Sequence, residues 1–125
     1  MTSMLHEELT NRIIGAAIAV HKVLGPGLKE QSYQAALAME FNEVGLAYQR
    51  APVFSVTYRG AIVGEHIPDF IVENAVVVEL KAVSALEPVF TAQVLTYLRL
   101  SGLRVGLIVN FNVEALRFGV KRVVK

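Results

Sequence analysis

Two carboxylates and one ammonium group lie close together in a part of the chain that is otherwise apolar. Glu79 and Lys81 interrupt the run Val76-Val77-Val78-Glu79-Leu80-Lys81, and Asp69 precedes that run. A run so rich in valine predicts a central strand that is covered on both faces. Because successive side chains of a strand point to opposite faces, a carboxylate and an ammonium group project from one face of it.

Asp69 is expected to stand directly opposite Glu79 if the turn between the two strands centres on Asn74. Side chains paired in this way have Cβ atoms about 4.5–5.5 Å apart, and like charges at that distance destabilise a sheet. Lys81 is one group that could compensate them. A divalent cation is a better one, because Mg²⁺ is commonly held by one or two carboxylates together with waters and phosphate oxygens. The pair therefore predicts a metal site.

Three polar residues on predicted helices add to this set. Glu30 falls at the centre of an apolar helical stripe, so we expect it to point inward, although the helix dipole also favours a glutamate in a first turn. Gln93 and Tyr97 lie one turn apart on a later helix. For these two alone, a helix flank and a core tyrosine with a satisfied hydroxyl are the simpler explanation.

The elements that must position these residues follow from periodicity. Apolar residues recur at three- and four-residue spacing in three segments, each of which ends at a glycine. The predicted helices span residues 3–24, 29–44 and 87–100. Runs rich in β-branched residues predict strands between and after them. The predicted strands span residues 52–58, 61–72, 75–83 and 103–111, and residues 120–124 fit a short final edge strand.

This order, α-α-β-β-β-α-β with a final edge strand, predicts an α/β fold. The strand, helix and strand over residues 75–111 should form a right-handed parallel crossover. Tight turns should join the three earlier strands in an antiparallel meander. The prediction is a mixed central sheet flanked by helices, in a single domain over residues 1–125, since 125 residues suit one hydrophobic core.

The composition is unusually apolar, with 54% hydrophobic and 18% charged residues. Typical soluble domains are about 45–50% apolar and about 25% charged. The surplus favours a dense core and an apolar subunit interface, so we expect a homodimer, the commonest symmetric oligomer. Residues 99–125 hold six basic residues against one acidic residue. That basic end could meet phosphates or could simply keep an apolar protein in solution.

Other classes of protein are excluded by what the sequence lacks. There is no cysteine, which excludes disulfides and thiol catalysis. No apolar run reaches the ~20 residues that a membrane span needs. The segment from Met1 to Glu8 carries two glutamates and no basic stretch, unlike a signal peptide. We therefore expect a cytoplasmic protein that has no membrane partner.

Several segments resemble one family of bacterial proteins. Gly27-Leu28-Lys29-Glu30-Gln31-Ser32-Tyr33 resembles the G-x-x-E-x-x-Y signature of the small GxxExxY protein family. Three further segments resemble the same family: Leu24-Gly25-Pro26-Gly27, Val78-Glu79-Leu80-Lys81-Ala82 and Leu107-Ile108-Val109-Asn110-Phe111. The similarity therefore covers nearly the whole chain. That family is placed in the PD-(D/E)xK nuclease-like superfamily, and the resemblance implies a restriction-endonuclease-like core.

The superfamily pattern can be carried over to individual positions. Pro68-Asp69 matches the P-D element, and Glu79-Leu80-Lys81 matches E-x-K. Glu30 is similar to the acidic residue of the first helix, and Gln93 and Tyr97 look like the Q-x-x-x-Y element of RecB-like exonuclease domains. The resemblance implies that the catalytic residues are Asp69, Glu79, Lys81, Gln93 and Tyr97. It also implies that Mg²⁺ or Mn²⁺ is bound by Glu30, Asp69, Glu79 and the carbonyl of Leu80.

The function implied is metal-dependent hydrolysis of phosphodiester bonds in nucleic acid, with DNA favoured over RNA as the partner. An alternative stays open, in which the nuclease fold binds nucleic acid or a protein partner without cutting. The net charge of only +1 favours that alternative somewhat, because affinity for nucleic acid depends on neutralising phosphates.

Overall fold

The computed structural model describes residues 4–125, and its centre is a mixed sheet of five strands in the order β1-β4-β5-β6-β7. β5 and β6 are parallel, and every other neighbouring pair is antiparallel. The strands are β1 (Tyr48–Arg50), β4 (Phe70–Val72), β5 (Val76–Lys81), β6 (Val105–Asn110) and β7 (Val120–Val124). The predicted mixed α/β sheet, its parallel crossover and its final edge strand are confirmed.

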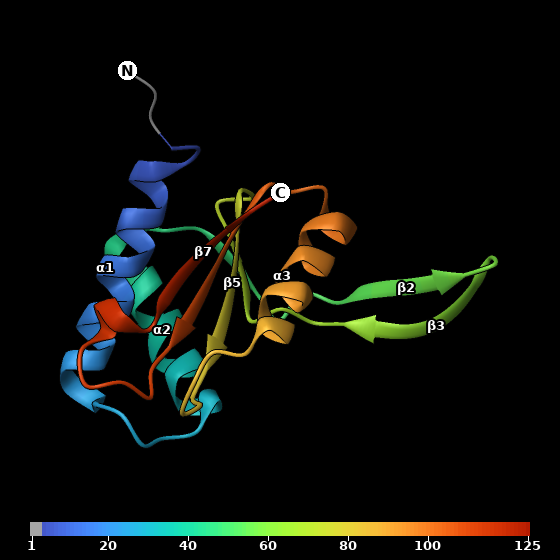
Figure 1. The fold of residues 1–125 in the computed structure, drawn as a ribbon. Helices are drawn as coiled ribbons and strands as arrows, with labels where there is room; N and C mark the ends of the chain where they lie inside the picture. Colours follow the sequence, from blue (N-terminus) through green and yellow to red (C-terminus); the bar gives the residue numbers. More distant parts are fainter. Residues whose placement is uncertain (1–3) are drawn as a thin grey trace.

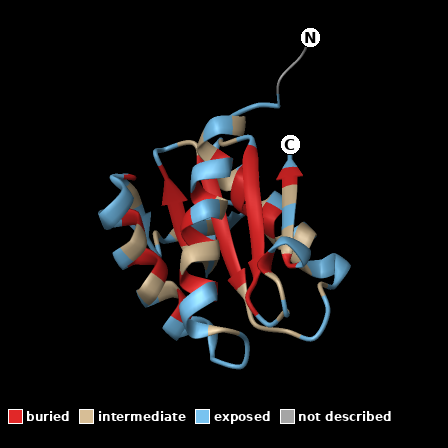
Figure 2. Ribbon diagram, turned by 90° about the vertical axis from the view of Figure 1, so that its left-hand side faces the viewer, coloured by how far each residue is buried: buried red, intermediate tan, exposed pale blue. Residues whose placement is uncertain are grey.

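Helices cover both faces of this sheet. α1 (Glu7–Leu24) and α2 (Glu30–Val44) lie on one face, and α3 (Pro88–Ser101), which connects β5 to β6, lies on the other (Figure 1). Two separate clusters of buried side chains result. Figure 2 shows the buried strands behind the outward, exposed surfaces of α1 and α2. β5 and β6 are buried almost throughout because helices cover them on both sides.

The helices end where the sequence predicts. Gly45 and Gly102 close α2 and α3 in the left-handed conformation, with φ of 76° and 75°, which glycine adopts without steric cost. Pro88 occupies the first turn of α3, where its missing N–H has no intrahelical partner to lose. The predicted start of the first helix, at residue 3, lies outside the described residues. Within them α1 begins at Glu7 after a short turn.

The predicted long strand over residues 61–72 is wrong. β2 (Phe54–Tyr58) and β3 (Ala61–His66) form a separate two-stranded sheet that projects from the body as an arm (Figure 1). The chain breaks at Ile67-Pro68, where proline has no N–H to continue a ladder, and then resumes as β4. The predicted three-stranded meander is therefore also wrong. β4 pairs with β5 and with β1, a short strand that we did not predict.

The register between β4 and β5 positions the site. Phe70 pairs with Val78 and Val72 with Val76 across a tight turn. Glu73 and Asn74 have φ of 53° and 52°, and the Ala75 N–H donates to the Val72 carbonyl, as in the type I′ turn that suits a β-hairpin. Continued by one residue, this register sets Asp69 opposite Glu79, as predicted. Within residues 4–125 no helix is long and apolar enough to cross a membrane.

Candidate active site

Glu79 and Lys81 project from the carboxyl-terminal half of β5 toward α3. Their neighbour Val77 belongs to the hydrophobic cluster on the α3 side, whereas Val78 and Leu80 belong to the cluster under α1 and α2. Glu79 is only 6% exposed, which is rare for a glutamate. The predicted alternation therefore places a carboxylate and an ammonium group on one buried face.

Asp69 is tied to this strand by two hydrogen bonds. Its backbone N–H donates to Oε1 of Glu79 at 3.2 Å, and its Oδ2 accepts the Leu80 N–H at 2.8 Å. Each bond joins a backbone N–H to a side-chain oxygen. Together they link the residue before β4 to the end of β5, just beyond the last regular backbone pair. The two carboxyl groups are thereby held beside one another by the backbone.

The proximity of the two acids changes the protonation of Glu79. Burial, followed by the side chain of Asp69, raises the pKa of Glu79 to about 8. Lys81 acts in the opposite direction, with its Nζ 3.9 Å from Oε2 of Glu79, but does not outweigh them. At neutral pH the isolated chain therefore favours a protonated Glu79.

Two side chains of α3 complete the arrangement on this face. Lys81 Nζ donates to Oε1 of Gln93 at 3.2 Å, and the Tyr97 hydroxyl donates to Oε2 of Glu79 at 3.2 Å. Burial and the Glu79 charge raise the pKa of Tyr97, so its hydroxyl remains a donor. The ring of Phe90 lies 4.4 Å from Lys81 Nζ and further fixes the ammonium group. Gln93 and Tyr97 thus contact the strand residues, which a helix flank alone would not require.

Glu30 does not point inward, contrary to our expectation. It is exposed at the first residue of α2, and residues 4–125 contain no group of three or more Asp, Glu, His or Cys residues placed to hold a metal ion. The helical stripe fixes the angle of Glu30 around the axis. It does not show whether other elements cover that position, and Glu30 is exposed to water.

Gln34, one turn after Glu30, makes the contact that sequence reasoning missed. Its Nε2 donates to Oδ1 of Asp69 at 2.7 Å, and its Oε1 accepts the Arg50 Nε–H at 2.9 Å. The available signal was weak, since Gln34 follows Tyr33 at the edge of an apolar stripe. Two further residues also border the site without having been assigned to it. The His66 ring packs 5.6 Å from that of Tyr97, and the buried Asn110 side chain bonds both backbone groups of Val83 just after β5.

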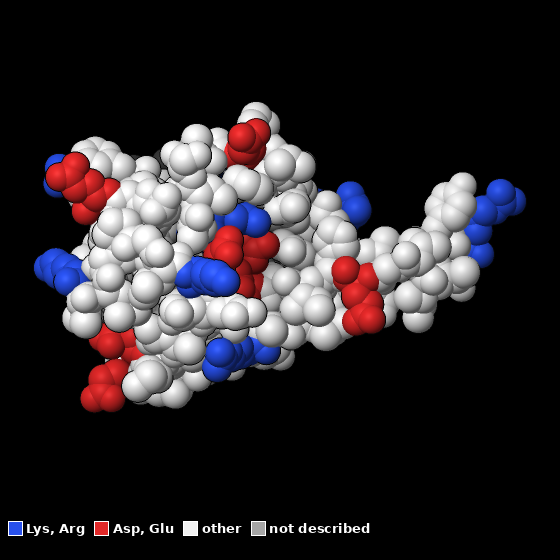
Figure 3. All heavy atoms as spheres, turned by 90° about the horizontal axis from the view of Figure 1, so that it is seen from below, with Lys and Arg blue, Asp and Glu red and all other residues white. Residues whose placement is uncertain are grey.

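The donor set fits a divalent cation. Two adjacent carboxylates, Asp69 and the buried Glu79, offer the hard oxygen ligands that Mg²⁺ and Mn²⁺ take. Seen from the end of the molecule at which β5 finishes, acidic side chains gather in the middle of the surface with basic ones beside them (Figure 3). Surface hollows of about 550 and 530 Å³ lie elsewhere, at the start of α1 and around Ile18 and Leu116, and neither is lined by Asp69 or Glu79. The carboxylate chemistry, rather than hollow size, therefore locates the site.

A comparison of the sequence with protein families identifies one superfamily. The family model of the PD-(D/E)XK nuclease superfamily matches residues 7–123, which includes all the residues of the site. No curated protein and no solved structure matches the chain significantly.

Proposed function

We propose that this chain, which belongs to the PD-(D/E)XK nuclease superfamily, hydrolyses phosphodiester bonds of nucleic acid with the help of Mg²⁺ or Mn²⁺. The observation that carries the proposal is the buried Glu79 carboxyl group, held beside Asp69 and facing Lys81. Two ionised carboxylates held together in a sheet repel each other, and a bound cation would relieve that repulsion.

Asp69 and Glu79 would hold the cation, together with the carbonyl of Leu80. The Leu80 N–H already points to Asp69, and the N–H and C=O of one residue in a strand point the same way. Glu30 lies on the same face of α2 as Gln34, one turn earlier, and would contribute through a water. The cation, when bound, supplies Lewis-acid polarisation of the phosphate and lowers the pKa of a water.

The side chains around the pair have separate roles. Lys81 would orient the attacking water or neutralise the charge that develops on the phosphate, and Gln93 holds its ammonium group in place. Tyr97 keeps Glu79 directed toward Asp69 through its hydroxyl. Gln93 and Tyr97 would also position the phosphate or the nucleic-acid strand that flanks it.

The experiment is incubation of labelled DNA and RNA, single- and double-stranded, with Mg²⁺ or Mn²⁺. We expect cleavage, with DNA preferred, and we expect Asp69→Ala, Glu79→Ala and Lys81→Ala each to abolish it, because these groups act as a unit. Glu43→Ala removes an exposed carboxylate from the far end of α2 and serves as the matched control, which should retain the wild-type rate. Cleavage that survives Asp69→Ala would refute the assignment.

A second candidate is a module that binds nucleic acid or a protein partner without cutting it. The absence of a third acidic residue beside Asp69 and Glu79 within residues 4–125 favours this candidate. Calorimetry separates the two. Divalent-ion binding that is lost in Glu79→Ala supports the nuclease, whereas a wild-type protein that binds no such ion supports the module.

We also propose that the protein forms a homodimer, in keeping with its apolar surplus. The arm formed by β2 and β3 carries large apolar side chains that are more than half exposed, among them Tyr58, Ile62 and Val63. A two-stranded hairpin is marginally stable in water unless other elements cover it. A second copy of the chain would provide that cover.

A further inference from the structure

An arginine outside the acid pair is connected to it through a single amide side chain. Arg50 Nε donates to Oε1 of Gln34 at 2.9 Å, and Gln34 Nε2 donates to Oδ1 of Asp69 at 2.7 Å. The orientation of the amide is determined by its partners, because a guanidinium can only donate and an ionised carboxylate can only accept. Arg50 and Asp69 are therefore held at a fixed separation by Gln34.

The backbone brings Arg50 to the same place. Arg50 is the last residue of β1 and pairs with Phe70, the residue that follows Asp69. The next residue, Ala51, donates its N–H to the Asp69 carbonyl at 2.8 Å. The edge strand thus ends beside Asp69, and its final side chain lies at the margin of the candidate active site.

Most of the hydrogen-bonding capacity of Arg50 is unused. A guanidinium offers five N–H groups, and within residues 4–125 only Nε has a protein acceptor. Arg50 is exposed and makes no ion pair with any residue in 4–125. Within that range the ion pair is between Lys81 and Glu79. The free N–H groups of this guanidinium, which Gln34 holds near Asp69, match the bidentate geometry by which arginine binds phosphate.

We propose that Arg50 binds a phosphate of the nucleic-acid backbone adjacent to the phosphate at the Asp69–Glu79 pair. Gln34 is a positioning residue that fixes both the arginine and the aspartate. The proposal rests on the proposed function for its class of ligand, a polynucleotide, but it does not depend on the cleavage step. Arg50 would fix how the bound nucleic-acid strand is aligned relative to the acid pair.

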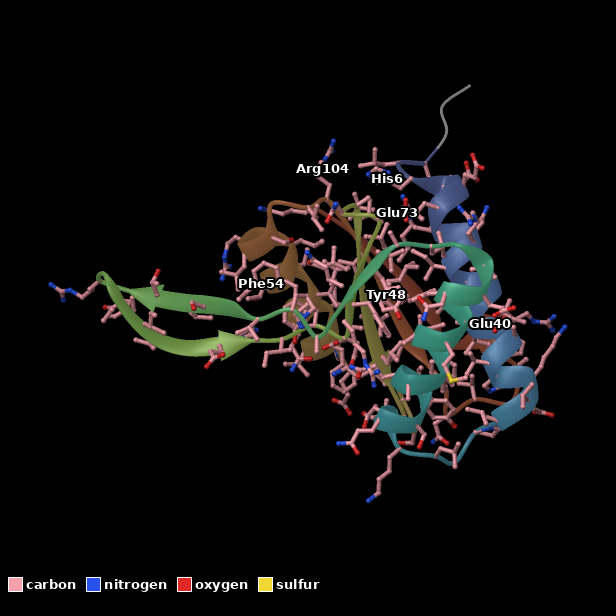
Figure 4. The ribbon with its side chains drawn as sticks, turned by 180° about the vertical axis from the view of Figure 1, so that it is seen from behind. His6, Glu40, Tyr48, Phe54, Glu73 and Arg104 are labelled. Atoms are coloured by element: carbon pink, nitrogen blue, oxygen red, sulfur yellow. The ribbon has the colours of Figure 1, made fainter. Side chains whose placement is uncertain are left out.

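The test measures binding of a labelled DNA oligonucleotide by fluorescence anisotropy across a series of salt concentrations, in EDTA so that no metal-dependent cleavage occurs. Loss of one phosphate contact should reduce the slope of log affinity against log salt by about 0.7–0.9. We expect this reduction in Arg50→Ala. Arg104→Ala is the matched control, because Arg104 is an exposed arginine just before β6, at the opposite end of the parallel pair from Lys81 (Figure 4).

Gln34→Ala tests the positioning role, because it changes no charge. We expect its salt slope to stay at the wild-type value while its affinity falls about two- to tenfold, as expected when a long side chain must be ordered on binding. Thermal melts of all three variants check that they fold. An unchanged affinity for Gln34→Ala would refute the role of Gln34.

The proposal for Arg50 is overturned if Arg50→Ala and Arg104→Ala have the same slope, or if the wild-type protein shows no salt-dependent binding. A protein that binds DNA through Arg50 but cuts no substrate in the separate cleavage assay would overturn the proposed nuclease function and leave this inference standing. The two failures are therefore distinguishable.

Discussion

At Glu79, a proton and a cation compete for the same carboxyl group. Burial and the adjacent Asp69 raise the pKa of Glu79 to about 8, whereas Lys81 lowers it. Metal ions bind the ionised form, so the proton must leave before the cation can be held. Affinity for the cation should therefore increase as pH rises through the pKa of Glu79.

We predict that calorimetric titration with Mn²⁺ will show affinity rising from pH 6 to beyond pH 8. Below the pKa, each pH unit should strengthen binding about tenfold, which corresponds to ~1.4 kcal/mol. Glu79→Gln should bind Mn²⁺ more weakly and should lose the pH dependence of affinity that arises from the Glu79 carboxyl group. An affinity for the wild-type protein that is flat over that range would contradict the proton–cation competition.

The residues of the site differ in how far the sequence reveals them. Glu79 and Lys81 could be assigned to one face because strand alternation fixes side-chain direction, and Asp69 followed from the turn at Asn74. Gln34 could not be found in this way. Its contact with Asp69 depends on where α2 lies relative to the end of β4, which helical periodicity does not encode. The same missing information made the predicted orientation of Glu30 wrong.

Among the elements, those with a strong periodic signal were predictable and those without one were not. The helices and the buried strands β5 and β6 carry long apolar patterns. β1 has three residues, two of them exposed, and joins the sheet through backbone pairing with β4. The break between β3 and β4 falls at Ile67-Pro68, and the proline that marks it is visible in the sequence. The sequence does not show that β3 pairs only with β2, in an arm that projects from the body.

α3 must approach the sheet closely for Gln93 and Tyr97 to reach β5. Gly106 on β6 allows this, because a Cβ there would lie 2.4 Å from Cγ1 of Val94 on α3. We predict that Gly106→Ala will lower the free energy of unfolding by about 1–3 kcal/mol, since the β-branched valine cannot move aside. Urea denaturation measures the change.

Val94→Ala provides the matched control for that substitution. It removes the methyl group that the new Cβ would meet, so the double variant should be less destabilised than the sum of the single variants. Strict additivity of the two free-energy changes would show that α3 does not pack on β6 as described.

At the scale of the whole molecule, the projecting arm of β2 and β3 would leave large apolar side chains in water if the protein were a monomer. We predict that light scattering will show a dimer, and that Ile62→Lys will shift it toward monomer because a charge on an exposed strand opposes pairing between chains. Met39→Lys is the control, since Met39 is 72% exposed on α2 and Ile62 is 69% exposed on β3. A wild-type monomer at high concentration would remove the dimer.

The most direct test of the central claim is the metal dependence of cleavage. Labelled DNA is incubated with the wild-type protein and with Lys81→Ala, first in EDTA and then with Mn²⁺ in excess. A metal-dependent nuclease site at Asp69, Glu79 and Lys81 predicts no cleavage in EDTA, cleavage by the wild-type protein on adding Mn²⁺, and none by Lys81→Ala under either condition. Cleavage that proceeds in EDTA, or that Lys81→Ala retains, would contradict it.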